Sequence, residues 1–304
     1  MKPVRSLLAL GTAVALVSGV VVLSGGGTVQ AETPPKTGPK CTVQANTPAS
    51  GQTTLVDSTA PKVTSVKWSA ATVRVATLST VTVTLRTTDN CSGVGDLWVL
   101  AKNLSSGVVE TLPATLASYT TDADSIDDVW TAELTVRGAQ RGKWVVAEVW
   151  VLPAFTSLTY DSATATVVTR TPDPLTASDS AYAKVHPAGP PTVRVDALTK
   201  VTVDAAPEPI TLGKKLTVSV RVTRADLNGY VAAGGVTVAV QVKAPGSKTW
   251  LALASVKTGS AGKAAATFTP KKKGVYTFRA VYKGVVGLAA STSPSDAVTV
   301  KPAK

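Results

Sequence analysis

The sequence predicts an all-β protein built from two antiparallel β-sandwiches in tandem after a signal peptide. Its 304 residues correspond to about two domains. Threonine, valine and alanine dominate, and an apolar content of 44% is that of a folded protein. Many short runs alternate apolar with small polar residues, as expected for strands that bury one face, and no helical period appears beyond the first 31 residues.

The first 31 residues have the layout of a secretory signal peptide. Lys2 and Arg5 precede an apolar run over residues 7–23, and Val29 and Ala31 place small residues at the expected positions before a cleavage site. The alternative is an uncleaved membrane anchor, but the run is short for a span and serine, threonine and glycine interrupt it. We expect a secreted protein, extracellular or wall-associated, with no transmembrane anchor after cleavage.

Residues 32–60 form an extended leader rich in proline and threonine, which holds Cys41. Cys91 is the second of two cysteines, and an isolated pair in an oxidising compartment is most simply a disulfide. A disulfide between Cys41 and Cys91 would close the loop of about 50 residues between them and stabilise the fold by roughly 4 kcal/mol on the chain-entropy model. A reactive thiol or a metal ligand is the alternative, which the lack of a neighbouring histidine disfavours.

Residues 61–170 predict the first sandwich. STVTVTLRTTDN turns Val81, Val83 and Leu85 inward, and the turn DNCSGVGD follows it. VWTAELTVRG places four residues on one face, namely Trp130, Ala132, Leu134 and Val136. Five further runs bring the set to seven short strands at sandwich spacing: PKVTSVKWS, DLWVLAKN, VVETLPATL, RGKWVVAEVWVLP and LTYDSATATVVTR.

Residues 171–193 have the composition of a proline-rich linker and hold the chain's single histidine, His186. Residues 194–304 predict the second sandwich. KKLTVSVRVTR places Leu216, Val218, Val220 and Val222 on one face. GGVTVAVQVKAPGSKTW, WLALASVKT, AGKAAATFTP, GVYTFRAVYKG and SDAVTVK follow as strands.

DAAPEPITLGKKLTVSVRVTR, together with the later strands GGVTVAVQVKAPGSKTW, GVYTFRAVYKG and SDAVTVK, resembles a domain of exported actinobacterial proteins. The first sandwich more loosely resembles bacterial Ig-like domains built around D-x-x-S-G-V, here residues 89–94. Those relatives continue their G-x-W strand into an Asp-containing turn that ends in Gly-Asn, whereas this chain has PAFT at residues 153–156. The resemblance implies two Ig-like domains that serve as spacers, adhesion units or wall-binding units, and it implies no chemistry.

Catalytic motifs are missing from the sequence. The single histidine stands in a proline-rich segment without a nearby nucleophile, zinc sites need several histidines or cysteines, and no glycine-rich phosphate loop is present. A carboxylate-dependent hydrolase needs only Asp and Glu, and nothing in the sequence favours one. We expect no enzyme activity and no cofactor.

Calcium is an open alternative at one acidic turn, since carboxylates on loops supply the oxygens that calcium prefers. The crowded residues are Asp122, Asp124, Asp127 and Asp128. Their spacing fits no EF-hand loop, and aspartate is also a common turn residue. The choice is between a calcium-binding adhesion domain and a plain acidic hairpin turn.

The stretch RGKWVVAEVWVLP raises a question about its tryptophans. Strict alternation with the valines inside puts Trp144, Glu148 and Trp150 on the outer face. The neighbouring strand adds Trp98 and Lys102, giving an aromatic strip suited to a sugar-binding module. The alternatives are a core tryptophan of opposite parity, a β-bulge that splits the set, or a surface that docks another domain or a protein partner.

Positive charge is concentrated in the C-terminal third, where residues 197–304 carry 16 basic and 4 acidic side chains. The candidate contacts for an anionic wall polymer or polysaccharide are Lys214, Lys215, Lys271, Lys272, Lys273, Arg279 and Lys283. Solubility is the alternative use of this charge. Nucleic acid is not expected, because the aromatics near Arg279 alternate into the core. The predicted function is a secreted, non-enzymatic binding or structural protein whose basic domain contacts anionic polymers.

Overall fold

The computed structural model describes residues 14–17, 20–23, 42–44, 52–121, 125–161, 166–171 and 177–303. Over these residues the chain is all-β, as predicted, with strands and two short 3-10 turns as its regular elements. None of the described segments is a helix long and apolar enough to span a membrane. The chain divides into two compact units. Unit 1 comprises Met1–Ala71, Thr80–Leu134 and Trp144–Val193; unit 2 comprises Thr72–Ser79, Thr135–Lys143 and Arg194–Lys304.

Unit 1 holds most of the strands up to β14. They are β1 (Val14–Val17), β2 (Val20–Leu23), β3 (Thr42–Gln44), β4 (Gln52–Val56), β5 (Lys62–Trp68), β7 (Leu78–Asp89), β8 (Val94–Asn103), β9 (Val109–Thr121), β10 (Ile126–Arg137), β11 (Gly142–Pro153), β12 (Ser157–Asp161), β13 (Thr166–Thr171) and β14 (Ala183–Val185), with the turn η2 (Asp179–Ala181). The predicted signal peptide contributes the antiparallel pair β1–β2, and its cleavage site lies outside the described residues.

The main strands of unit 1 follow the order β5-β7-β10-β9-β8-β11. Strand β9 joins the two halves, because its start pairs with β8 and its end pairs with β10. The predicted inward residues of β7 and β10 are buried, which confirms both alternations. The leader and the end of the first predicted sandwich meet in a separate sheet of order β13-β12-β4-β3.

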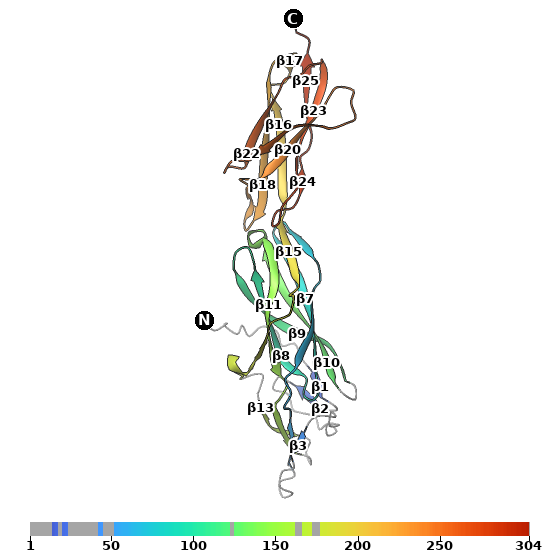
Figure 1. The fold of residues 1–304 in the computed structure, drawn as a ribbon, viewed down its shortest axis with the longest axis vertical. Helices are drawn as coiled ribbons and strands as arrows, with labels where there is room; N and C mark the ends of the chain where they lie inside the picture. The colour runs from blue at the N-terminus through green and yellow to red at the C-terminus, as the bar shows by residue number, and fades with distance from the viewer. Residues whose placement is uncertain are drawn as a thin grey trace. The chain divides into compact units, whose positions relative to one another are not determined.

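Unit 2 holds the strands β6 (Thr72–Val75), β15 (Thr192–Ala197), β16 (Thr199–Ala206), β17 (Ile210–Thr211), β18 (Leu216–Asp226), β19 (Gly229–Ala232), β20 (Thr237–Lys243), β21 (Leu251–Lys257), β22 (Lys263–Phe268), β23 (Gly274–Tyr282), β24 (Ser291–Thr292) and β25 (Asp296–Lys301), with the turn η1 (Gly138–Gln140). Figure 1 shows β16, β17, β18, β20, β22, β23, β24 and β25 gathered in a sandwich, with the C-terminus beside β17 and β25.

Two sheets face each other in unit 2. One has the order β16-β18-β19 with β22 beside β18, and the other has the order β17-β25-β23-β20-β21 with β24 beside β23. Their inner faces share one apolar core, which includes Val218, Val220, Val240, Phe278 and Val298. Since every second residue of β18, β20 and β23 enters this core, the alternation predicted from KKLTVSVRVTR and GVYTFRAVYKG is confirmed.

Candidate functional site

The D-x-x-S-G-V motif of unit 1 is a tight turn between β7 and β8. Asp89 Oδ2 accepts hydrogen bonds from the Ser92 and Gly93 amides at 2.7 and 2.6 Å. Gly93 has φ +71, and a Cβ there would lie 3.3 Å from a methyl carbon of Ile126. The aspartate and the glycine are therefore explained by the backbone geometry of the turn itself.

Two more buried carboxylates hold the same turn. Asp57 Oδ2 accepts from the Ser92 amide and Asp128 Oδ2 accepts from the Val94 amide, both at 3.2 Å. Each of Asp57, Asp89 and Asp128 is 5% exposed, and none forms an ion pair with another described residue. This grouping was not predictable from the sequence, because Asp57 stands in the leader and Asp128 in a stretch that looks like a solvated turn.

Burial disfavours the charged form of these groups. It raises the pKa of Asp89, and the nearby Asp57 carboxylate raises that pKa further. Burial likewise raises the pKa of Asp128 to about 6, against the opposing effect of its hydrogen bond from Val94 and with a contribution from Asp89. Unit 1 therefore carries two buried carboxyl groups with raised pKa values, of which that of Asp128 is about 6.

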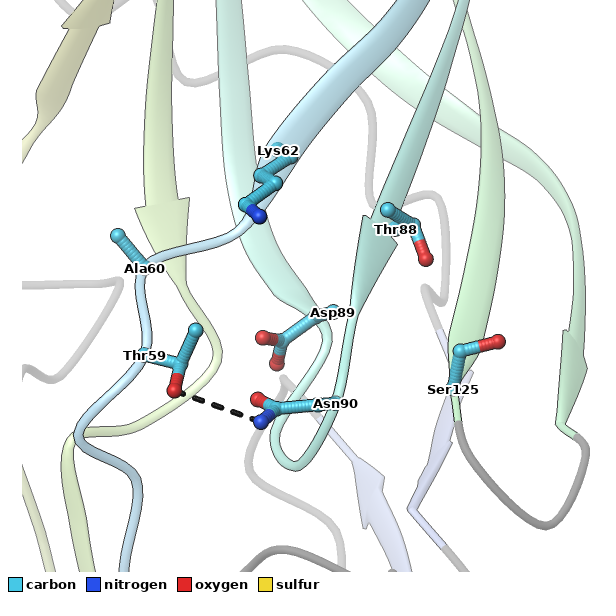
Figure 2. Close-up of a pocket in the computed structure, with 7 residues that line it drawn as sticks. All are labelled: Thr59, Ala60, Lys62, Thr88, Asp89, Asn90 and Ser125. Atoms are coloured by element: carbon cyan, nitrogen blue, oxygen red, sulfur yellow. Dashed lines mark hydrogen bonds between the residues drawn. The ribbon is translucent and has the colours of Figure 1, made fainter.

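A cavity of about 220 Å³ opens beside this turn. Its lining residues are Thr59, Ala60, Lys62, Thr88, Asp89, Asn90 and Ser125, as Figure 2 shows. The Asn90 amide donates to Thr59 Oγ1 at 3.4 Å, while Asp89 Oδ1 and Asn90 Oδ1 are buried without a hydrogen-bond partner. The Lys62 ammonium points into the same space. The cavity thus combines one carboxylate with a cation and several neutral oxygens.

Of the four predicted calcium ligands, the structure describes Asp127 and Asp128. Asp122 and Asp124 lie outside the described residues, Asp127 is exposed, and the Asp128 carboxylate is turned toward the Val94 amide. In the part of the chain that is described, no three His, Cys, Asp or Glu side chains are placed to hold a metal ion.

Cys41 also lies outside the described residues, so the Cys41–Cys91 disulfide stays a prediction. Cys91 is 1% exposed in a small apolar cluster with Leu55 and Phe155. Thr42, which follows Cys41 in sequence, pairs with Val56 of β4. Asp57, the residue after Val56, accepts a hydrogen bond from the Ser92 amide, and Ser92 follows Cys91 in sequence. The residues that follow the two cysteines are therefore brought close together, which supports the predicted disulfide.

The prediction of an outer strip of three tryptophans is wrong, because β11 contains a β-bulge. The register passes from Val146↔Ala101 to Glu148↔Leu100, so Ala147 is an extra residue. As a result Trp144 faces the core with Val149 and is 0% exposed, and the face of three tryptophans does not exist. The sequence prediction assumed strict alternation across all of β11, which the bulge breaks.

Trp98 and Trp150 do lie together on the outer face, directly opposite each other in the β8–β11 pair. The segment expected to be a linker covers Trp150: β14 pairs with β11, the Tyr182 ring is 6.3 Å from the Trp150 ring, and Lys184 Nζ is 4.7 Å from it. Asp96 Oδ2 accepts from both the Trp98 indole and the Tyr182 hydroxyl. These tryptophans hold the connecting segment in place.

The remaining residues of the predicted sugar site are dispersed. Lys102 is exposed on β8, and Glu148 is half-buried on β11 with an oxygen 3.7 Å from Nε2 of His186. The His186 side chain is 76% exposed. It contacts a carboxylate and no described nucleophile, which agrees with the expectation of a solvated histidine.

Five of the predicted basic residues gather at one end of unit 2. Lys214 and Lys215 follow β17, Lys271 to Lys273 precede β23, and the Gly213 amide donates to the Pro270 carbonyl at 3.3 Å between the two loops. Lys301 joins them, because Thr211 pairs with it across β17 and β25. We name this set the lysine tip: Lys214, Lys215, Lys271, Lys272, Lys273 and Lys301. All six are exposed, and none is ion-paired with a described residue.

Arg279 and Lys283 do not belong to the lysine tip. Lys283 follows the far end of β23 and lines a cavity of about 450 Å³ with Val281 and Val285. Arg279 lies midway along β23, where its Nε donates to Gln241 Oε1 at 2.7 Å. The predicted basic set therefore divides into a tip, a central arginine and a distant lysine.

No protein-family model matches the chain, and no curated protein matches it. Solved structures match at low similarity. FdeC, an adhesin of Escherichia coli, is 15% identical with a TM-score of 0.32, over 79% of this chain and 64% of that chain. A putative membrane-anchored protein of Corynebacterium diphtheriae is 15% identical with a TM-score of 0.28, over 78% of this chain and 53% of that one.

The CARDB domain of a Pyrococcus furiosus protein is 17% identical with a TM-score of 0.25, over 34% of this chain and 95% of that domain. The chain thus matches less than two thirds of the two longer proteins and nearly all of the short one. The fold class rests on the strands and sheets described above.

Proposed function

We propose that this chain is a secreted, non-enzymatic protein that binds anionic cell-wall or matrix polymers through the lysine tip of unit 2. The observation that carries the proposal is the gathering of six exposed lysines, none ion-paired with a described residue, from three separate segments at one end of the sandwich of unit 2. The last 108 residues contain four acidic residues, and one of them, Glu208, stands in the turn before β17. A single carboxylate beside β17 leaves the six lysines of the tip with a strong net positive charge.

Electrostatic attraction to a polyanion explains such a surface better than solubility, which needs no clustering. Each lysine near a negatively charged surface contributes about 1 kcal/mol, and salt weakens the sum because the screening length falls from about 10 Å at 0.1 M to about 3 Å at 1 M. Binding should therefore be strong at low salt and reversible at high salt.

The sugar-binding alternative has less support. Trp144 is in the core, and Trp150 lies against Tyr182 and Lys184. A carboxylate-dependent hydrolase also has less support, since such enzymes use two carboxylates across the scissile bond and the described cavity of unit 1 has one, Asp89.

The test is a pull-down of residues 32–304 with purified Gram-positive cell wall across a salt series. The tip variant changes Lys271, Lys272 and Lys273 to Gln. A matched control changes Lys257, Lys263 and Lys283 to Gln, three exposed lysines at the opposite end of unit 2. We expect the tip variant to bind at least about tenfold more weakly at low salt and the control to bind almost normally. Equal losses in both variants would mean diffuse charge and would overturn the tip as the contact.

A further inference from the structure

Arg279 is held rigidly on the outer face of the β20–β23 pair. Its chain neighbours Phe278 and Ala280 are fully buried, and Gln241 stands directly opposite it on β20. The Arg279 Nε donates to Gln241 Oε1 at 2.7 Å, and the guanidinium carbon lies 4.3 Å from the centroid of the Trp250 ring. A hydrogen bond and a stacking contact thus fix the plane of this side chain.

The charge of Arg279 is not neutralised by any described carboxylate. In the same unit, Arg194 and Arg224 each pair with an aspartate two residues further along the chain. Arg279 instead has a neutral amide and an aromatic ring as partners, and Lys243 adds a second cation 5.1 Å from the same ring. No described residue accepts a hydrogen bond from its two terminal amino groups, so the outer edge of the guanidinium remains available.

We propose that Gln241, Lys243, Trp250 and Arg279, here named the arginine clamp, form a binding site for a single oxyanion, a carboxylate or a phosphate. A guanidinium fork with two free amino groups matches two oxygens of such a group, and orientation before binding lowers the entropy that binding costs. The ammonium of Lys243 supplies further positive charge beside the ring.

The clamp deepens the proposed function, on which it rests for the source of the oxyanion. β23 begins beside the lysine tip at Gly274, and Arg279 follows five residues later, about 17 Å along the strand. Lys243, opposite Thr277, lies between the two along the strand direction. A polymer with repeated anionic groups can therefore contact the tip by charge alone and the clamp by a directed pair of hydrogen bonds.

The test uses isotope-labelled residues 32–304 and follows the Arg279 Nε–Hε and Trp250 indole resonances by NMR. Sodium phosphate and sodium glucuronate are added in separate titrations, with sodium chloride holding the ionic strength constant. We expect saturable shifts of both resonances, with a Kd of about 10 mM, for at least one of the two anions. A response to phosphate indicates a phosphate-bearing polymer, and a response to glucuronate indicates an acidic polysaccharide. No shift up to about 100 mM of either anion would overturn the site.

Two variants separate the clamp from general charge. Arg279→Lys keeps the charge but removes the guanidinium fork, and Gln241→Glu supplies an internal carboxylate to Arg279. Each variant should bind the anion at least fivefold more weakly, as followed by the Trp250 indole resonance. Lys257→Gln changes an exposed lysine of β21 that lies opposite Thr237 at the start of β20; it is the matched control and should bind unchanged. Equal affinity in Arg279→Lys would overturn the directed role of the arginine. Because these titrations use small anions, they succeed or fail independently of the pull-down on cell wall.

Discussion

Asp128 is a residue whose ionisation opposes the fold. It is 5% exposed, its partner is the neutral Val94 amide, and its pKa is raised to about 6. A carboxyl with a raised folded-state pKa stabilises the protein fully below its unfolded pKa of 3.8, and this contribution is lost as pH rises through about 6. Asp89, whose pKa is also raised, acts in the same direction.

We therefore predict that Asp128→Asn removes a pH dependence of stability. The asparagine oxygen can still accept from Val94 and carries no charge to desolvate. The free energy of unfolding of wild type relative to this variant should fall by on the order of 3 kcal/mol between about pH 4 and pH 7.5. Urea unfolding of both proteins across that range measures it. A difference that stays constant with pH would show that the buried carboxyl is not protonated near neutrality.

At the scale of a strand, the bulge in β11 decides which tryptophan is core. Ala147 is the extra residue, and the residues before and after it already pair with Ala101 and Leu100. Deleting Ala147 would leave a regular strand in which Trp144 still faces inward and Trp150 outward. Deleting Val149 instead would shift the residues beyond it and turn Trp150 into the core.

We predict that the chain without Ala147 folds with a modest loss of stability, whereas the chain without Val149 does not fold cooperatively. Thermal unfolding followed by near-ultraviolet circular dichroism, which reports tryptophan packing, compares the two deletions. If both deletions were equally damaging, the bulge would be needed for its local twist and not merely accommodated.

This strand also shows what the sequence can and cannot predict about elements. The alternation of apolar and polar residues correctly predicted which side chains are buried in β7, β10, β18 and β23, because each of these strands keeps its alternation across a buried face. It failed at β11, because a bulge is set by pairing with β8 and leaves no mark in the hydrophobic pattern. The strand β14 was missed because its three residues sit in a proline-rich segment and pair only with β11.

The candidate sites, like the strands, were only partly predictable from the sequence. The lysine tip was predictable in composition, although sequence could not tell that Lys301 joins it and that Lys283 does not. The arginine clamp was half visible: Arg279 was a candidate, but Trp250 and Gln241 reach it only through the β20–β23 pairing and the turn before β21. The roles of Asp57 and Asp128 at the D-x-x-S-G-V turn needed the tertiary structure, because their partners are the backbone amides of Ser92 and Val94, far along the chain.

At the scale of the whole molecule, the last prediction concerns how the leader is attached. β4 of the leader pairs with β12, and Leu55 packs in the cluster that contains Cys91. A Cys41–Cys91 bond would close a loop of about 50 residues and stabilise by roughly 4 kcal/mol in the chain-entropy model. We expect Cys41→Ala in residues 32–304 to unfold at a lower urea concentration than the oxidised wild type, and at the same concentration as wild type after reduction. Cys91→Ala should cost somewhat more, because it also removes a sulfur from the apolar cluster. A wild-type midpoint unaffected by reductant would mean that the strands alone hold the leader, and that the two cysteines remain thiols.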